Sequence, residues 1–264
     1  MKSLDQIPDT LRRSLRGIFS DIDDTITTNG MLSAEAYTAI ENISNRGIEF
    51  IPITGRPAGW CDMIARFWPV KGVIGENGAF FFSYDHKKKK MIRRYIQNEK
   101  ERSEGRKKLE LIKQQVLKEV PGCAVSSDQF SRISDLAIDF CEDVPELPID
   151  AVKKIKEIFV QSGATTKISS IHVNSWFGDY NKLEMTRIFT KEILGIELDS
   201  NKDKFVFCGD SPNDEPLFHY FPNSCGVANV RNFNSEMKYL PTYVASSKGG
   251  KGFVEICSKL LELK

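Results

Sequence analysis

Short apolar runs alternate with helix-like patterns along the first third of the chain. Residues 17–21 and 48–53 are apolar runs of strand length, and residues 33–45 between them place apolar side chains three and four positions apart. Ser33 is a suitable helix cap, and Gly47 closes the segment. A strand, a helix and a second strand in this order predict the beginning of a parallel sheet.

The pattern changes at Glu76-Asn77-Gly78, which is a turn signal. Before this turn we predict a helix over 60–67 and a strand over 70–74. After it the chain becomes rich in strands and begins with a hairpin pattern, which a parallel α/β sheet does not usually contain. The elements predicted there are strands at 80–85, 91–96, 134–140 and 167–176 and helices at 101–120 and 149–161. Together they indicate an α+β insertion about the size of a small domain.

After Gly178 the first pattern resumes. We predict helices at 182–194, 215–220 and 252–263 and strands at 205–208 and 224–227. The expected fold is therefore α/β, with a Rossmann-like parallel-sheet core at residues 1–80 and 179–264. An α+β cap at residues 81–178 would interrupt this core and select the substrate.

Composition narrows the range of partners. The chain has 264 residues, a hydrophobic content of 41% and a formal net charge of +1, so it can bury a core and has no global field for nucleic acid or membrane. No apolar run approaches the about 20 residues of a membrane span, and the N-terminus lacks an apolar signal core. The six scattered cysteines lack pairing or metal-ligand spacing and indicate reduced thiols. We expect a cytoplasmic protein.

A basic run, His86-Lys-Lys-Lys-Lys90 with Arg93 and Arg94, is the strongest local charge cluster. Such a run can bind nucleic acid, but it falls on a predicted hairpin turn close to acidic residues. We interpret it as a solvated turn and expect no nucleic-acid partner.

Chemistry-bearing residues follow three of the predicted core strands. Asp21, Asp23, Asp24 and Thr25 follow the first strand, Thr54-Gly55-Arg56 the second, and Gly209 to Asp214 a later one. Each loop alone could be a solvated turn with helix caps. Because the carboxyl ends of parallel strands meet at one sheet edge, the loops would open together there. With Lys182 they supply carboxylates, a hydroxyl and an ammonium, a set suited to a phosphoryl group and a divalent metal.

The order of these motifs resembles the haloacid dehalogenase superfamily of phosphohydrolases. The matching segments are Asp21-x-Asp23-x-Thr25, Thr54-Gly55-Arg56, Lys182 and Gly209-Asp210-x-x-Asn213-Asp214. The insertion between Thr54 and Lys182 is similar to the type IIB cap, found in Cof-type, sucrose-phosphate and trehalose-phosphate phosphatases. The sequence departs from the family at Asp24, where many relatives carry glycine, and at Leu183, where the Cof-type pattern favours glycine.

The resemblance implies a role for each matched residue. Asp21 would be the nucleophile that forms an aspartyl-phosphate, and Asp23 the general acid and base. Thr54, Gly55 and Lys182 would bind the phosphoryl oxygens. Mg²⁺ would be held by the following residues: Asp21, Asp23 through its main-chain oxygen, Asp210, Asp214 and Asn213.

The last predicted cap strand alternates in polarity. Its polar side carries His172, Asn174 and Trp176, and we expect the first two to hydrogen-bond a hydroxylated leaving group and Trp176 to stack on it. The alternative is a solvated outer face. Arg132 is a further candidate, for a second anionic group.

We therefore predict a magnesium-dependent phosphomonoesterase for a small, sugar-like phosphate, with this phosphorylated metabolite as its partner. Two alternatives use the same residues. A sugar phosphomutase of the superfamily would return the phosphoryl group to the sugar, and a non-catalytic binding protein would keep only the fold. The oligomeric state does not follow from the sequence.

Overall fold

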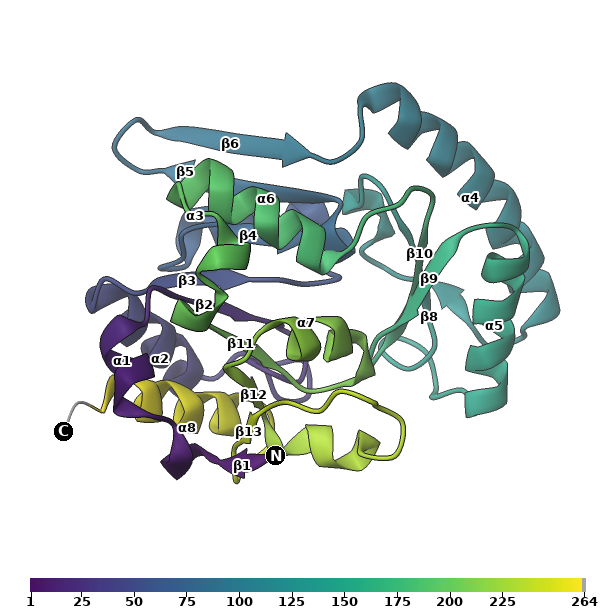
Figure 1. Cartoon of the computed structure of the whole chain (residues 1–264). Helices are drawn as coiled ribbons and strands as arrows, with labels where there is room; N and C mark the ends of the chain where they lie inside the picture. Colours follow the sequence, from purple (N-terminus) through teal and green to yellow (C-terminus); the bar gives the residue numbers. More distant parts are fainter. Residues whose placement is uncertain (263–264) are drawn as a thin grey trace.

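Six parallel strands form the main sheet of the core (Figure 1). The computed structural model describes residues 1–262. Along the sheet the strands are β1 (Lys2–Ser3), β13 (Tyr243–Val244), β12 (Ser224–Gly226), β11 (Phe205–Gly209), β2 (Gly17–Ser20) and β3 (Glu49–Pro52). All neighbouring pairs in this order are parallel. The predicted parallel sheet is confirmed.

Helices cover both faces of this sheet. Neighbouring side chains of a strand point to opposite faces, so Ile18 packs in the cluster beneath α2, α3 and α8 while Phe19 packs in the cluster beneath α6 and α7. The core helices are α1 (Asp9–Ser14), α2 (Ala34–Asn45), α3 (Ala58–Phe67), α6 (Lys182–Leu194), α7 (Glu215–Tyr220) and α8 (Gly249–Leu261). Burial on both faces explains why the central strands are continuously apolar.

The hairpin after the turn at residues 76–78 extends the core. β4 (Val73–Gly75) joins the end of β3 through a parallel bridge between Ile53 and Ile74. β5 (Phe80–Asp85) and β6 (Lys90–Tyr95) then pair antiparallel with β4 and with each other. The sequence pattern predicts that this hairpin belongs to the cap, because periodicity identifies strands but does not reveal which sheet they join. We propose a cap boundary near residue 98 in place of 81.

The cap is a four-stranded antiparallel sheet covered by two helices on the side away from the core (Figure 1). Its strands, in spatial order, are β7 (Ala124–Val125), β8 (Leu136–Asp139), β10 (His172–Trp176) and β9 (Thr165–Ile168). Its helices are α4 (Glu99–Glu119) and α5 (Ile149–Gln161), which close a separate apolar cluster over the sheet. The predicted α+β insertion is confirmed.

The single strand predicted over 167–176 is wrong, because the chain turns back within it. β9 and β10 form a hairpin in which Val173 is paired with Ile168. Ser169 makes the turn: its Oγ accepts a hydrogen bond from the backbone N–H of His172 (3.0 Å). A serine turn of this kind competes with strand continuation.

Most other predicted elements agree with the structure. The helices predicted at 149–161, 182–194 and 215–220 have these bounds. The closing helix begins at Gly249 and ends at Leu261, and Leu263, its predicted last residue, lies outside the described residues. All six cysteines are unpaired. Within residues 1–262 no helix combines the length and apolarity needed to cross a membrane.

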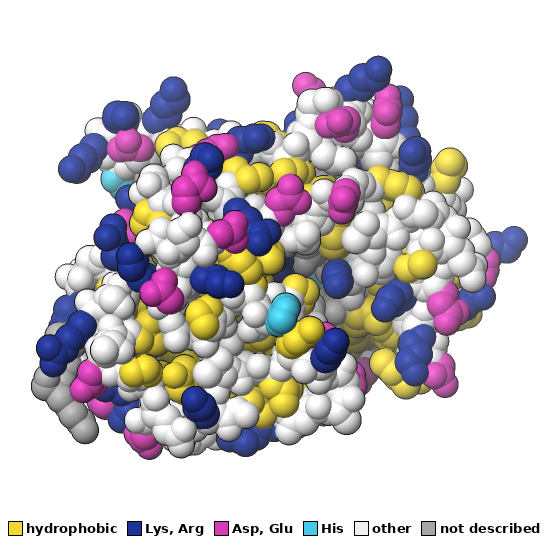
Figure 2. Space-filling model, viewed as in Figure 1, with side chains coloured by type: hydrophobic (Ala, Val, Ile, Leu, Met, Phe, Trp, Pro, Cys, Tyr) yellow, Lys and Arg dark blue, Asp and Glu magenta, His cyan; other side chains and the backbone are white. Residues whose placement is uncertain are grey.

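The basic run lies at the exposed tip of the β5–β6 hairpin. Residues 86–90 are all exposed. Figure 2 shows Lys and Arg side chains (dark blue) gathered at this end of the molecule, while acidic side chains are interspersed with basic ones over the rest of the visible face. The exposure agrees with the solvated turn expected from the sequence.

Candidate active site

The three predicted loops meet at the carboxyl edge of the main sheet. Asp21 directly follows β2 and Asp210 directly follows β11, and the backbone N–H of Asp21 donates to the carbonyl of Cys208 on β11 (2.9 Å). The Thr54-Gly55-Arg56 loop follows β3, the other neighbour of β2. Parallel pairing therefore brings together residues separated by almost 190 positions in the chain, as Thr25 and Asp210 show with their hydrogen bond.

Three buried carboxylates converge at this edge. Asp21, Asp210 and Asp214 each place an oxygen within 4.8 Å of the others. Asp214 reaches back to the strand, where its Oδ2 accepts a hydrogen bond from the backbone N–H of Asp210 (3.1 Å). Gly209 permits this approach, because a Cβ there would lie 2.5 Å from the same oxygen.

Lys182 is the buried cation of this cluster. It is the first residue of α6, and its Nζ lies 2.7 Å from Asp21 Oδ1 and 3.2 Å from Asp214 Oδ1. One ammonium does not balance three carboxylates. Burial, together with the neighbouring carboxylates, accordingly raises the pKa of Asp21 to about 8 and that of Asp210 well above its ordinary value. The chemistry of these donors fits a divalent cation, which would supply the two missing charges.

The loop after β3 presents backbone and a glycine to the pocket. Gly55 lines the pocket, whereas Thr54 is fully buried and its Oγ1 accepts a hydrogen bond from the backbone N–H of Arg56 (3.0 Å). The Thr54 hydroxyl therefore shapes the loop, and the backbone N–H of Thr54 anchors it by donating to the carbonyl of Ile74 (2.9 Å).

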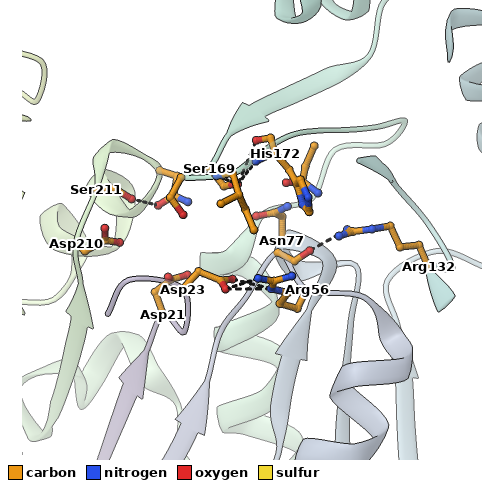
Figure 3. A pocket seen from close by; sticks show the side chains of 14 residues that line it. Asp21, Asp23, Arg56, Asn77, Arg132, Ser169, His172, Asp210 and Ser211 are labelled. Atoms are coloured by element: carbon orange, nitrogen blue, oxygen red, sulfur yellow. Dashed lines mark hydrogen bonds and ion pairs between the residues drawn. The ribbon is translucent and has the colours of Figure 1, made fainter. Parts of the chain in front are cut away.

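Arg56 links the core to the cap. Its guanidinium pairs with Asp23 through two nitrogens (2.8 and 3.0 Å), and its Nη2 also lies 2.9 Å from Glu142 of the cap. Figure 3 shows Asp23 and Arg56 facing each other across the pocket floor. The interaction with His172, whose Nε2 lies 2.9 Å from Glu142 Oε2, and the pairing with Arg56 lower the pKa of Glu142 to about 2. The sequence motif includes Arg56 but does not by itself indicate these contacts. The only sequence signal for Arg56 is its position directly after Thr54-Gly55.

Core and cap together line one pocket between them. Its lining residues are Asp21, Asp23, Gly55, Arg56, Asn77, Arg132, Ser169, Ser170, Ile171, His172, Asn174, Asp210, Ser211 and Asn213. In Figure 3, His172 and Ser169 of the cap lie over Asp21, Asp23 and Asp210 of the core. The sheet edge with its carboxylates is thus the floor of the pocket and the cap is its roof.

Two of the three predicted cap residues line the pocket and the third does not. His172 lies against Glu142, and Asn174 Nδ2 donates to Asp135 Oδ2 (3.0 Å). The expected stacking of Trp176 on the substrate is not supported, because its ring is buried and stacks on Tyr180 with centroids 5.5 Å apart. The Trp176 and Tyr180 rings are both buried and do not line the pocket. Alternation of polar and apolar residues therefore does not show how far along the strand the pocket extends.

The remaining predicted residues surround the same site. Asn213 lines the pocket, and its Oδ1 accepts a hydrogen bond from Ser211 (3.0 Å). Asp24 adopts a left-handed conformation with φ of 55°, which explains why glycine suits this position in relatives. Asn77 also lines the pocket and has a φ of 55°. The sequence pattern indicates only that this residue is part of a turn.

Comparisons with known proteins agree with this geometry. Residues 18–130 match the family model of haloacid dehalogenase-like hydrolases. No curated protein matches the chain. A structure from Thermoplasma acidophilum superposes with a TM-score of 0.70 at 18% identity, over 93% of this chain and 98% of that one. A Synechocystis sucrose-phosphatase, solved with sucrose and phosphate, gives 0.63 at 15% identity over 95% and 99%. A trehalose-6-phosphate phosphatase related protein gives 0.60 at 15% identity over 92% and 95%.

The family match covers the first part of the chain, and the fold extends the likeness to the rest. Over residues 18–130 the chain resembles the haloacid dehalogenase-like hydrolases, and its core carries a cap as a second layer. The match supports the predicted resemblance to this superfamily and the prediction of a hydrolase.

Proposed function

We propose that this protein is a phosphatase that hydrolyses a small, sugar-like phosphate monoester through an aspartyl-phosphate on Asp21. The observation that carries the proposal is the buried cluster of Asp21, Asp210 and Asp214 around the single ammonium of Lys182, on the floor of a pocket roofed by the cap. Such a cluster is costly to bury unless a further cation offsets its excess of negative charge.

Asp21 is the proposed nucleophile. One carboxylate oxygen would attack phosphorus as the bond between phosphorus and the ester oxygen breaks, and water would then attack phosphorus and restore the carboxylate. Lys182 lies 2.7 Å from Asp21 and favours the ionised form of that carboxyl against the effect of burial, and its ammonium would also stabilise the charge on the transferring phosphoryl oxygens. The backbone N–H of Gly55, which lines the pocket, would bind the same oxygens, while the N–H of Thr54 donates to the carbonyl of Ile74 (2.9 Å) and holds the loop in place.

Asp23 is the proposed general acid and base. It would protonate the leaving oxygen and later accept a proton from the attacking water. Arg56 holds its carboxylate through two nitrogens, so the group is oriented before the substrate arrives.

The proposed cofactor is Mg²⁺. The residues that would hold it are Asp21, the Asp23 main-chain oxygen, Asp210, and Asp214 with Asn213. When bound, it would supply two positive charges that offset repulsion between the Asp21 carboxylate and the phosphate. The charge deficit of the cluster supports this assignment.

The sugar-like leaving group is inferred from the cap. His172, Asn174 and the serines at 169 and 170 give the roof hydrogen-bonding groups suited to hydroxyls. The likeness to a sucrose-phosphatase and to a trehalose-6-phosphate phosphatase related protein supports the same class of substrate.

The test is phosphate release from sugar phosphates, nucleotides and pyridoxal phosphate, with Mg²⁺ and with EDTA, for the wild type and Asp21→Asn. We expect release that depends on Mg²⁺ and falls at least about 10³-fold in the variant, since the nucleophile is lost. Absence of release from every ester would refute the proposal, and transfer between bound sugar positions would instead indicate a mutase.

A further inference from the structure

Apart from His172 Nε2, which lies 2.9 Å from a Glu142 oxygen, two buried donors in the pocket wall have no hydrogen-bond partner among residues 1–262. They are Asn77 Nδ2, on the core side, and Arg132 Nη2, on the cap side. The Asn77 residue is 6% exposed and the Arg132 side chain is fully buried. A buried N–H without an acceptor is unfavourable in a folded protein, because the group has lost its hydrogen bonds to water. Two such groups in one pocket indicate that a bound molecule supplies the acceptor oxygen.

The charge of Arg132 is already balanced within the protein. Its Nε lies 3.1 Å from Asp128 Oδ1, and its Nη1 lies 3.1 Å from both oxygens of Asp135. The buried Glu76 carboxylate lies on the neighbouring backbone, where it accepts hydrogen bonds from Ile133 and Ser134. Arg132 therefore offers a free N–H but no unbalanced positive charge. The Asn77 amide is a neutral donor.

Both donors lie beside the loop that would bind the phosphoryl group. Arg132 Nη1 donates to the carbonyl of Gly55 (2.9 Å), and a Cβ placed on Gly55 would lie 3.2 Å from Asn77 Nδ2. Figure 3 shows Arg132 extending across the cap side of the pocket toward Asn77. The pair thus faces the space between the loop and the roof, where a leaving group attached to a bound phosphate would begin.

We propose that Arg132 and Asn77 form a leaving-group subsite that donates to an uncharged oxygen close to the ester bond, and that it discriminates against a carboxylate there. The inference rests on the proposed function and narrows its substrate class. An added carboxylate would bring a further negative charge to a wall where Asp128, Asp135 and Glu76 already outnumber Arg132. It also replaces the second anionic group expected from the sequence.

Two phosphate esters with the same carbon skeleton test the charge selection. Glycerol 3-phosphate and 3-phosphoglycerate differ in a hydroxymethyl group against a carboxylate. We expect the wild type to have a kcat/KM at least about tenfold higher for glycerol 3-phosphate. Equal values, or a preference for 3-phosphoglycerate, would overturn the proposal.

Substitution tests the donors themselves. Asn77→Gly removes the amide and suits the left-handed backbone, and Arg132→Lys keeps the charge and removes the free Nη2. The readout is the ratio of kcat/KM for glycerol 3-phosphate to that for p-nitrophenyl phosphate, whose leaving group has no hydroxyl beside the ester. We expect each variant to lower this ratio about tenfold. A matched control is Lys89→Gly, a left-handed residue on the exposed β5–β6 turn, which should leave the ratio unchanged.

Two results contradict the subsite. If both esters lose kcat/KM equally, the donors bind the phosphoryl group, and if neither changes, they bind nothing in the reaction. Binding of glycerol 3-phosphate and 3-phosphoglycerate to Asp21→Asn can be measured by calorimetry without turnover. This measurement separates the subsite from the proposed phosphatase function. Preferential binding of glycerol 3-phosphate that is lost on adding Asn77→Gly supports the subsite even where hydrolysis fails, and equal binding overturns it.

Discussion

At the scale of single residues, the main feature of the site is an excess of buried negative charge. Three buried carboxylates share one ammonium, and burial raises the pKa values of Asp21 and Asp210. The sequence predicted these residues because short spacings after strands place them at one sheet edge. It did not predict the contacts of Arg56, Arg132 and Asn77, because each of these depends on where the cap meets the core.

The charge deficit predicts a trade-off at Asp210. In EDTA, Asp210→Asn should raise the melting temperature by a few degrees, because a neutral amide removes a buried charge whose ionisation is costly. The amide oxygen can still accept the Thr25 hydroxyl, which lies 3.3 Å from Asp210 Oδ1. Millimolar Mg²⁺ should stabilise the wild type and not the variant. Thermal unfolding with and without Mg²⁺ measures both effects, and a variant less stable than wild type in EDTA would count against this account.

At the scale of elements, most helices and strands of the core followed from the periodicity of apolar residues. The failures have a common cause. Periodicity shows that residues 80–95 form strands, but only the bridge between Ile53 and Ile74 shows that they continue the core sheet. The hairpin at Ser169 was missed because two serines do not interrupt a run of strand-forming residues as glycine or proline would.

Glu76, in the turn between β4 and β5, connects the core to the cap through its side chain. The buried Glu76 carboxylate accepts hydrogen bonds from Ala58, the first residue of α3, and from Ile133, Ser134 and Asp135, which lead into β8. Burial raises the pKa of Glu76 from 4.5 to about 7, and Asp135 contributes in the same direction. One carboxylate thus joins a core helix to a cap strand at the cost of an unfavourable ionisation.

This cost predicts a pH dependence of stability. Because the folded form of Glu76 binds its proton more tightly than the unfolded form, its contribution to the free energy of unfolding should fall as pH rises from 4.5 to about 7. The fall should amount to up to about 3 kcal/mol. The free energy of unfolding, measured with urea at each pH across this range, should depend less steeply on pH for Glu76→Gln than for the wild type. The exposed Glu157→Gln is the control and should keep the wild-type slope. An unchanged slope in Glu76→Gln would show that this carboxylate does not titrate in the window.

At the scale of the whole molecule, function is divided between two layers. The main sheet supplies the proposed nucleophile, the proposed acid and base and the proposed cation site at one edge, and the cap supplies the roof of the pocket and the partners of Arg56 and Gly55. Because core loops and cap residues share these contacts, opening of the cap would expose the reacting groups to water. The parallel core was predictable from sequence pattern, whereas the fit between the layers is a property of the folded chain.

The central claim is that Asp21 carries the phosphoryl group. The most direct measurement is borohydride reduction of the enzyme quenched during turnover, followed by mass spectrometry of the peptide that contains residues 17–28. An aspartyl-phosphate is reduced to homoserine, so the account requires homoserine at position 21 when a hydrolysed ester and Mg²⁺ are present and none when EDTA replaces the metal. Homoserine at another aspartate, or turnover with position 21 unmodified throughout, would contradict it.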